Sequence, residues 1–169
     1  KQAEFYLAEG ERIGRLGTWA FNATSVEYWS DGLFRIHGIE PGNPPTTPEL
    51  LAIVHPEDRA FMAQAVRTML AEKNAFDFTK RIVRSDGAIR HIRYVGKPVT
   101  DAEIFKGFVG IGMDVTEQLR LVSELRQSEQ EWRQMVDLSP QPVQILGSKR
   151  ERLYLNRTAI DYLGVNLDE

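Results

Sequence analysis

Residues 76–99 read FDFTKRIVRSDGAIRHIRYVGKPV, and this stretch decides the fold class. Apolar side chains alternate with polar ones at its start: Phe76, Phe78 and Ile82 with Asp77, Thr79 and Arg81. A period of two is typical of a β-strand with one buried face. The tripeptide Ser-Asp-Gly at residues 85–87 is a turn signal, so the next strand, expected over residues 88–100, runs antiparallel to the first. A third strand is predicted over residues 105–115.

Two helices are expected before this sheet. The dipeptides Thr47-Pro48 and His55-Pro56 each mark a helix start, because proline at the first helical position lacks only a donor that would be unpaired anyway. The second helix should run from about residue 56 to residue 73, with one continuous apolar face.

The N-terminal part begins with an amphipathic helix over residues 1–13, in which apolar positions recur at spacings of three and four. Two short aromatic-rich strands are expected over residues 18–22 and 26–30, followed by a short helix that Gly38 ends. The order of these elements predicts an α+β domain, with helices packed on one face of an antiparallel sheet.

Composition narrows the class of protein. The chain has 169 residues with 42% hydrophobic content, which is enough for one good core and short for two complete domains. Its formal net charge is only −3, so no basic field attracts nucleic acid or an anionic membrane, and we expect no contact with either. No apolar run approaches the roughly 20 residues that span a bilayer. The chain has no cysteine, which excludes disulfides and cysteine-bound zinc, and we expect a cytoplasmic location.

Four segments together carry a resemblance to a known family. They are GTWAFNATSVEYWSDGLFRIHGIEPG at residues 17–42, LLAIVHPEDRAFM at 50–62, the strand pair at 76–99 and GFVGIGMDVTEQ at 107–118. In this order and at these spacings they resemble a PAS domain of the PAS-fold-3 subfamily, over about residues 14–118. The resemblance implies a five-stranded antiparallel sheet whose helical side can enclose a small ligand. It also implies a place in a bacterial multidomain signalling protein, where the domain senses a signal or pairs subunits.

An internal repeat indicates the same organisation. A shift of 126 residues superposes three pairs of residues: Tyr28 and Tyr154, Phe34 and Ile160, and Gly38 and Gly164. The second copy lacks the long helix and three strands, so it cannot close its own core, and we expect packing on a neighbour or partner chain to order it. The predicted domains are an N-terminal helix (1–13), a PAS sensor domain (14–116), a helical signal linker (117–138) and the incomplete start of a second PAS domain (139–169).

The segment between the two copies predicts a helix. Apolar residues follow heptad spacing along it: Leu121, Leu125, Trp132 and Met135. Only a little over two heptads are present, so the residues leave two alternatives open, a helix packed on its own domain and the seam of a dimer. The resemblance favours a parallel homodimer, in which this helix transmits a change to an effector domain farther along the same chain.

Asp114, Val115, Thr116 and Glu117 lie where the last predicted strand becomes this helix. Asp114 or Thr116 can cap the helix, and Glu117 stands three residues after Asp114 as in a capping box. The resemblance implies a further role for Asp114, Thr116 and Glu117, which is to couple the sheet to the linker helix.

A candidate ligand pocket lies between the predicted helices and the sheet. The apolar positions expected to face it are Ile36, Leu51, Met62, Val66, Met69, Phe78 and Phe108. Gly110 and Gly112 share one face of the last strand, and bulky neighbours or a ligand must fill the volume that their missing side chains leave. Filling by neighbours is the commoner outcome. Arg81 lies in a basic zone on adjacent strands, for which two interpretations stay open: a solvated sheet face paired with acids, which is the usual one, and contact with an anionic or carboxylate ligand through Arg81.

No cofactor is predicted, although an unidentified small molecule remains open. The histidines at positions 37, 55 and 91 fall on separate elements without ligand spacing, so neither a metal site nor haem is expected. Flavin is not expected either. Light-sensing flavin relatives use a reactive cysteine, and Gly112 stands where a flavin-contacting glutamine would stand.

Two classes of function remain. In the first, the chain is a ligand-responsive sensor, and in the second it is a ligand-free module that holds a dimer together. The sequence contains no pattern that pairs a catalytic nucleophile with a general base, and no phosphate-binding glycine loop. This part of the protein is therefore not expected to be an enzyme. The resemblance makes a sensor histidine kinase the expected effector, with a diguanylate cyclase or a transcription regulator as alternatives.

Overall fold

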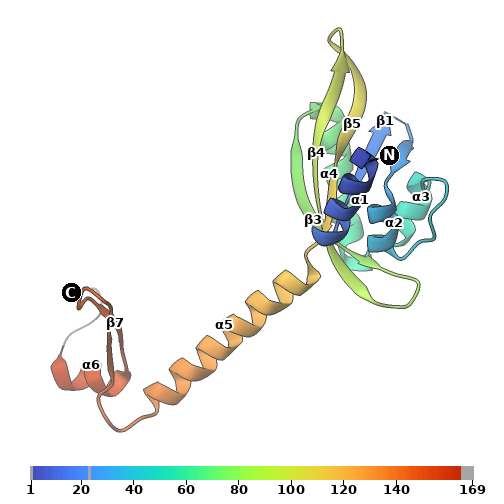
Figure 1. The fold of residues 1–169 in the computed structure, drawn as a ribbon. Helices are drawn as coiled ribbons and strands as arrows, with labels where there is room; N and C mark the ends of the chain where they lie inside the picture. Colours follow the sequence, from blue (N-terminus) through green and yellow to red (C-terminus); the bar gives the residue numbers. More distant parts are fainter. Residues whose placement is uncertain (1, 23, 165–169) are drawn as a thin grey trace. The chain divides into compact units, whose positions relative to one another are not determined.

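The computed structural model describes residues 2–22 and 24–164 (Figure 1). The chain forms two compact units, Lys1–Glu117 and Gln118–Glu169, and each contains its own antiparallel sheet. Three predicted segments extend beyond the described residues. They are the N-terminal helix at Lys1, the turn between the first two strands at residue 23, and the second copy at residues 165–169.

The first unit is built on a five-stranded antiparallel sheet. Its strands are β1 (Leu16–Asn22), β2 (Val26–Trp29), β3 (Phe76–Val83), β4 (Ile89–Asp101) and β5 (Ile104–Asp114). Their order in space is β2-β1-β5-β4-β3, so the last strand of the unit lies at the centre, between β1 and β4. The predicted antiparallel sheet is confirmed, and the predicted turn joins β3 to β4, with Gly87 at a φ of 80°.

The first unit also contains helices, three of which lie against the inner face of this sheet. The helical elements are α1 (Gln2–Ile13), α2 (Asp31–His37), α3 (Thr47–Ala52), the 3₁₀ turn η1 (Pro56–Asp58) and α4 (Arg59–Glu72). Side chains of α2, α3 and α4 lie against the sheet, whereas α1 packs on α2 and β1. Within residues 2–22 and 24–164, no helix combines the length and the hydrophobicity needed to cross a membrane.

Two helix starts differ from the prediction. The cap of α3 is Thr46 rather than Thr47, since the Glu49 carboxylate accepts from the Thr46 N–H at 2.7 Å and the Thr46 hydroxyl accepts from the Glu49 N–H at 3.5 Å. These two bonds form a capping box. The long helix begins at Arg59 instead of Pro56, because the preceding turn is a 3₁₀ helix.

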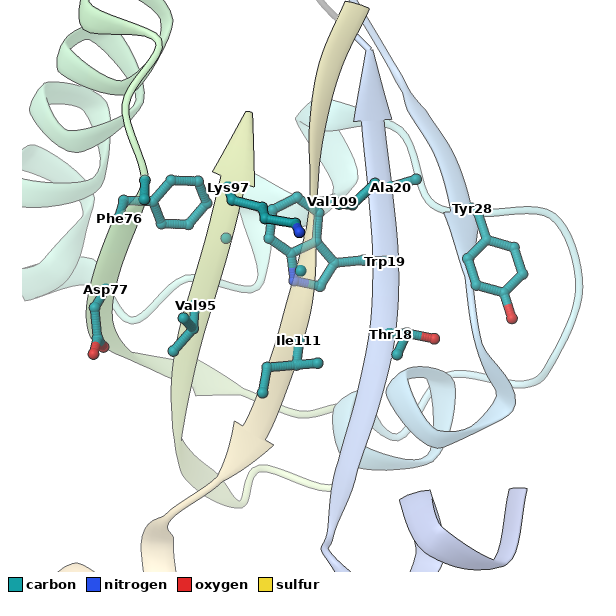
Figure 2. Close-up of a pocket in the computed structure, with 13 residues that line it drawn as sticks. Thr18, Trp19, Ala20, Tyr28, Phe76, Asp77, Val95, Lys97, Val109 and Ile111 are labelled. Carbon is teal, nitrogen blue, oxygen red and sulfur yellow. The ribbon is translucent and has the colours of Figure 1, made fainter. Parts of the chain in front are cut away.

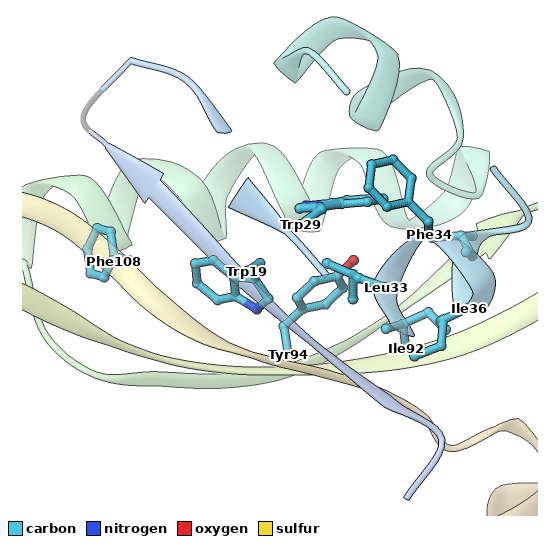
Figure 3. Close-up of a cluster of buried hydrophobic side chains, with 9 residues drawn as sticks. Trp19, Trp29, Leu33, Phe34, Ile36, Ile92, Tyr94 and Phe108 are labelled. Carbon is cyan, nitrogen blue, oxygen red and sulfur yellow. The ribbon is translucent and has the colours of Figure 1, made fainter. Parts of the chain in front are cut away.

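The core lies between the inner face of the sheet and α2 (Figure 3). The buried cluster consists of Trp19, Trp29, Leu33, Phe34, Ile36, Ile82, Ile92, Tyr94 and Phe108. Strand alternation brings Trp19 of β1 and Tyr94 of β4 to this face, and Leu33 of α2 packs on it. Full burial of one large apolar side chain contributes about 1.5–3 kcal/mol, so this cluster holds α2 firmly against the sheet.

Neighbouring side chains fill the space beside the two glycines of β5. A side chain at Gly110 would overlap the Val95 carbonyl oxygen and come within 2.7 Å of the Trp19 ring. A side chain at Gly112 would come within 2.8 Å of Leu33 Cδ1. The volume at both positions is therefore occupied by Trp19 and Leu33.

The second unit repeats part of the first. Its elements are the greater part of α5 (Thr116–Asp137), β6 (Gln144–Leu146), β7 (Arg152–Leu155) and α6 (Arg157–Leu163). At the shift of 126 residues, β7 and α6 have the same bounds as β2 and α2. Gly164 ends α6 at a φ of 65°, as Gly38 ends α2 at a φ of 69°. The sequence repeat is therefore also a structural repeat over these elements.

Asn156 joins the elements of the second unit. Its side chain is fully buried, and its Oδ1 accepts from the N–H groups of Val143 at 2.8 Å and Ala159 at 2.9 Å. Its Nδ2 donates to the carbonyls of Val136 at 3.0 Å and Gln141 at 2.9 Å. One amide thus connects the end of α5, the following loop and the start of α6.

Candidate functional site

An inner pocket lies between the sheet and the helices α3 and α4. It has a volume of about 140 Å³, and its wall is mainly apolar. Five of the predicted pocket residues line it: Leu51, Met62, Val66, Met69 and Phe78. The wall also contains side chains that the prediction did not assign to a pocket, among them Trp19, Trp29, Lys80 and Tyr94.

Four other predicted residues do not line this pocket: Ile36, Phe108, Gly110 and Gly112. Ile36 and Phe108 are buried in the core cluster instead. The two glycines lie against Trp19 and Leu33, which occupy the space that a ligand would need. The pocket is thus confined to the part of the inner face that α3 and α4 cover.

Arg81, the predicted anion contact, also lies outside the pocket wall. Its Nη2 donates to Asp58 Oδ1 at 2.5 Å and to Glu57 Oε2 at 2.9 Å. These bonds favour the charged carboxylate, and they lower the pKa of Asp58. The guanidinium of Arg81 is therefore already paired with two acids of η1.

A buried polar pair lies beside the pocket. His37 Nδ1 is 2.8 Å from the Leu33 carbonyl oxygen, and its Nε2 is 2.7 Å from the Tyr94 hydroxyl. Because a carbonyl only accepts, Nδ1 carries the proton and donates to it, and the Tyr94 hydroxyl donates to Nε2. Burial disfavours the charged imidazolium and lowers the pKa of His37 to about 4. The ring is therefore neutral at physiological pH.

Lys80 places a positive charge in the pocket wall. Its side chain is 8% exposed, and its Nζ lies 4.7 Å from the centre of the Tyr94 ring. Burial alone lowers the pKa of Lys80 to about 8, since no hydrogen bond or carboxylate among the described residues opposes this effect. At neutral pH the group is mainly charged.

The sequence contained a signal for one of the residues that the prediction missed. A period of two along β3 places Lys80 on the same face as Phe78 and Ile82. No comparable signal pairs His37 with Tyr94, because these residues are 57 positions apart and meet only through the fold.

A junction links β5 to α5 and ties both to β4. Asp114 Oδ1 accepts from the Thr116 N–H at 3.0 Å, which caps the first turn of α5. The Thr116 hydroxyl in turn accepts from the His91 N–H at 2.8 Å, and the Val115 N–H donates to the His91 carbonyl at 2.9 Å. The start of the helix is thus held to β4 by bonds on both sides of His91.

The segment before β1 reaches the same junction. The Arg15 carbonyl accepts from the Asp114 N–H at 3.1 Å, and the Arg15 guanidinium forms an ion pair with Glu117. Arg15 has a φ of 48°, a left-handed conformation that few residues other than glycine adopt. The predicted coupling residues Asp114, Thr116 and Glu117 therefore meet at one corner of the sheet.

Comparison with known protein families matches residues 26–110 to the family described as PAS fold. The chain belongs to this family. The resemblance seen in the sequence is confirmed, and the five-stranded sheet with its covering helices is that of a PAS domain.

Relatives of this PAS domain occur in signalling enzymes. The structure of a sensory box histidine kinase/response regulator from Burkholderia thailandensis E264 is 26% identical, with a TM-score of 0.58, over 76% of this chain and 98% of that chain. The N-terminal domain of a diguanylate cyclase with PAS/PAC sensor from Marinobacter aquaeolei shares the fold, at 19% identity and a TM-score of 0.56, over 61% of this chain and 97% of that chain. The probable diguanylate cyclase DgcE of Escherichia coli (strain K12) is 27% identical over 158 residues, which are 92% of this chain and 14% of DgcE.

Helix α5 exposes most of the residues predicted to form a seam. Leu121, Leu125 and Met135 are 52%, 71% and 66% exposed. Trp132 differs, because its ring lies 5.1 Å from that of Tyr154 and packs within the second unit. Leu121, Leu125 and Met135 are therefore largely exposed, whereas Trp132 packs on Tyr154 of β7.

The outer face of the PAS sheet carries a second apolar surface (Figure 2). This outer patch consists of Thr18, Ala20, Tyr28, Val95, Val109 and Ile111. Ile111 lies at its centre, because it pairs with Thr18 of β1 on one side and Val95 of β4 on the other. Asp77 and Lys97 border the patch.

The three histidines lie in different parts of the fold, and each forms hydrogen bonds there. His55 Nδ1 accepts from the Glu57 N–H at 3.4 Å and caps η1, whereas His37 and His91 bond within the core and the junction. Across the described part of the chain, no three His, Asp or Glu side chains gather closely enough to hold a metal ion.

Proposed function

We propose that this PAS domain is a sensory and dimerisation module that detects a small ligand in the inner pocket and transmits the signal through α5 to an effector domain. The proposal is carried by one observation, which is that β4 serves both sites. Tyr94 of β4 lines the pocket, and His91, three residues earlier, holds the start of α5 through Thr116. A ligand that moves β4 therefore acts directly on the junction.

Transmission through this junction requires two states. A ligand shifts the equilibrium between them only by the difference between its affinities for the two states. The contacts that such a change makes or breaks are the bonds from His91 to Thr116 and Val115 and the ion pair between Arg15 and Glu117.

The variant Asp114→Ala tests this proposal in the full-length parent protein. It removes the carboxylate that accepts from the Thr116 N–H, so the effector should lose its response to input and amide hydrogen exchange should rise over residues 116–120. Asp101→Ala is the matched control, because the Asp101 side chain is 79% exposed in the β4–β5 turn. Unchanged regulation together with unchanged exchange in Asp114→Ala would contradict the proposal.

A ligand-free dimerisation module is the second candidate function. The outer patch and the exposed apolar residues of α5 favour it, since contiguous exposed apolar surface marks interaction sites. Native mass spectrometry of the chain separates the two candidates. A retained small molecule supports the sensor, and an empty dimer supports the second candidate.

As effector we propose a histidine kinase, with a diguanylate cyclase as the alternative. The 26% identity to the kinase structure supports the first, and the match of 92% of this chain to DgcE supports the second. The purified parent protein should form phosphohistidine from ATP in the first case and cyclic di-GMP from GTP in the second. If the protein forms neither product, a transcription regulator is favoured.

Because both nucleotides are cytoplasmic, we also propose a cytoplasmic location, with the PAS domain as the regulatory part.

A further inference from the structure

Lys80 lies at a position where strand geometry places an apolar residue. β3 turns every second side chain to the inner face, and Lys80 lies between Phe78 and Ile82 on it. The Lys80 side chain is 8% exposed and forms part of the pocket wall. An ammonium group thus stands at a core position and reaches the inner pocket.

This ammonium group has no partner of opposite charge among the described residues. Its contact is the face of the Tyr94 ring, 4.7 Å from Nζ to the ring centre. His37 is neutral and already bonded to Leu33 and Tyr94, so it offers no free acceptor. A buried charge is costly unless it is paired, and the pocket is therefore electrostatically incomplete without a ligand.

A second buried donor, in the core beside the pocket, also has no acceptor among the described residues. Trp19 lines the pocket next to Tyr94 (Figure 3), and its buried indole N–H has no acceptor among the described residues. Buried donors in native proteins are nearly always paired. The Lys80 ammonium group, which forms part of the pocket wall, favours a ligand that carries a hydrogen-bond acceptor over a purely apolar one.

The rest of the wall sets the size and character of the ligand. It is aromatic and aliphatic, with Trp29, Leu51, Met62, Phe76 and Phe78 among its members. Its volume of about 140 Å³ is close to that of an engineered cavity of about 150 Å³ that binds benzene. One aromatic ring or a chain of about six carbons therefore fills the apolar part.

We propose that the inner pocket binds a small apolar carboxylic acid, with its carboxylate at Lys80 Nζ and its ring or short chain among the aromatic and methionine side chains. This inference rests on the proposed function, because it names the ligand class of the same pocket. The anion contact moves by one residue from the predicted Arg81, which is paired with Asp58 and Glu57, to Lys80 on the opposite face of β3.

Benzoate and hexanoate are the probes, and benzamide is the neutral analogue of benzoate. Binding to the chain of residues 1–169 is measured by isothermal titration calorimetry and by the fluorescence of Trp19 and Trp29, which line the pocket. A hydrogen bond to a charged group leads us to expect that benzoate binds about 10- to 100-fold more tightly than benzamide.

Lys80→Met removes the charge while keeping a long apolar side chain. The variant should bind benzoate and benzamide with equal affinity, whereas Lys97→Met, which changes an exposed lysine at the border of the outer patch, should bind as the wild type does. Circular dichroism and thermal unfolding check that both variants fold. Lys80→Gln is a second neutral variant for the same measurement.

Three results overturn the proposal: equal binding of benzoate and benzamide to the wild type, unchanged benzoate binding in both Lys80 variants, or no binding of any probe. Each of these leaves the sensor function standing, because a ligand of another class can occupy the pocket. Failure of the sensor function gives a different result from failure of the acid site. Benzoate bound through Lys80 without any change in hydrogen exchange over residues 116–120 overturns the sensor function and leaves the acid site.

Discussion

His37 is a single side chain whose burial makes the stability of the fold depend on pH. Its pKa is about 4 in the folded chain, below the ordinary 6.5, because burial disfavours the imidazolium. Between these values only the unfolded chain takes up the proton, so stability is complete above about pH 6.5 and decreases as the pH falls towards 4. We expect the free energy of unfolding to fall by up to about 3 kcal/mol over this window, as measured by urea unfolding.

Two variants isolate this effect from the titration of other groups. His37→Gln should abolish the part of the pH dependence that belongs to His37. His55→Gln should retain it, because His55 lies at η1 and outside the core cluster. Identical pH profiles for the wild type and His37→Gln would show that the expectation is wrong.

Lys80 is expected to lower the stability of the ligand-free chain. Burial lowers its pKa from 10.5 to about 8, so the stability is complete above about pH 10.5 and decreases as the pH falls towards 8. At neutral pH, Lys80→Met should therefore raise the free energy of unfolding by about 1–3 kcal/mol. Urea unfolding without ligand measures this change, and in the control Lys97→Met the free energy of unfolding should stay close to that of the wild type. A Lys80→Met chain less stable than the wild type would refute this account.

The contrast between Lys80 and Arg81 shows how far residue roles could be predicted from the sequence. Alternation along β3 identifies Lys80 as an inner-face residue by the same rule that identifies Phe78. Arg81 is not available to a ligand because it is paired with Asp58 and Glu57. The local sequence gives no signal for this pairing, since the two acids are 23 and 24 residues away from Arg81. Local patterns give the face of a side chain, and only the fold gives its partner.

The two glycines of the central strand β5 should differ in how well they tolerate a side chain: Gly112 tolerates one better than Gly110. Gly110→Ala would press on the backbone oxygen of Val95, which cannot move without disturbing the sheet, so we expect a loss of about 1–3 kcal/mol. Gly112→Ala meets a flexible carbon of Leu33 and should change the stability by less than about 1 kcal/mol. Thermal unfolding of the two variants measures both changes, and equal losses would contradict this difference in packing.

Element positions followed from periodicity, because burial of one face imposes it on both strands and helices. The strand predicted over residues 88–100 is β4 at Ile89–Asp101, and the strand predicted over residues 105–115 is β5 at Ile104–Asp114. Helix starts were less predictable. Thr46 and Thr47 both precede Pro48, and only the reciprocal bonds with Glu49 select Thr46 as the cap.

For the whole molecule, the outer patch predicts self-association of the PAS domain through the sheet. Ile111→Asp would place a charge at the centre of the patch, so it should raise the dimer dissociation constant at least tenfold in sedimentation experiments, which corresponds to about 1.4 kcal/mol. Ile104→Asp is the control, because Ile104 is 62% exposed at the start of β5 and lies outside the patch. A dimer that is equally stable in both variants would exclude the sheet as the interface.

The repeat of 126 residues was visible in the sequence because it preserves apolar positions and a helix-ending glycine. The type of effector that we propose has no signal in these residues, for a physical reason. The pocket and the junction are built from contacts within the first unit, and the same fold occurs in kinase and cyclase relatives.

Arg15 and Asp114 bring the start of β1 and the end of β5 to one corner of the sheet, since the Arg15 carbonyl accepts from the Asp114 N–H. A module with adjoining ends can be inserted between successive helices of a longer protein while adding almost no separation between them. On the proposed function, this corner would be a second route to α5, because the ion pair between Arg15 and Glu117 joins the segment after α1 to the first turn of α5 without using a pocket residue.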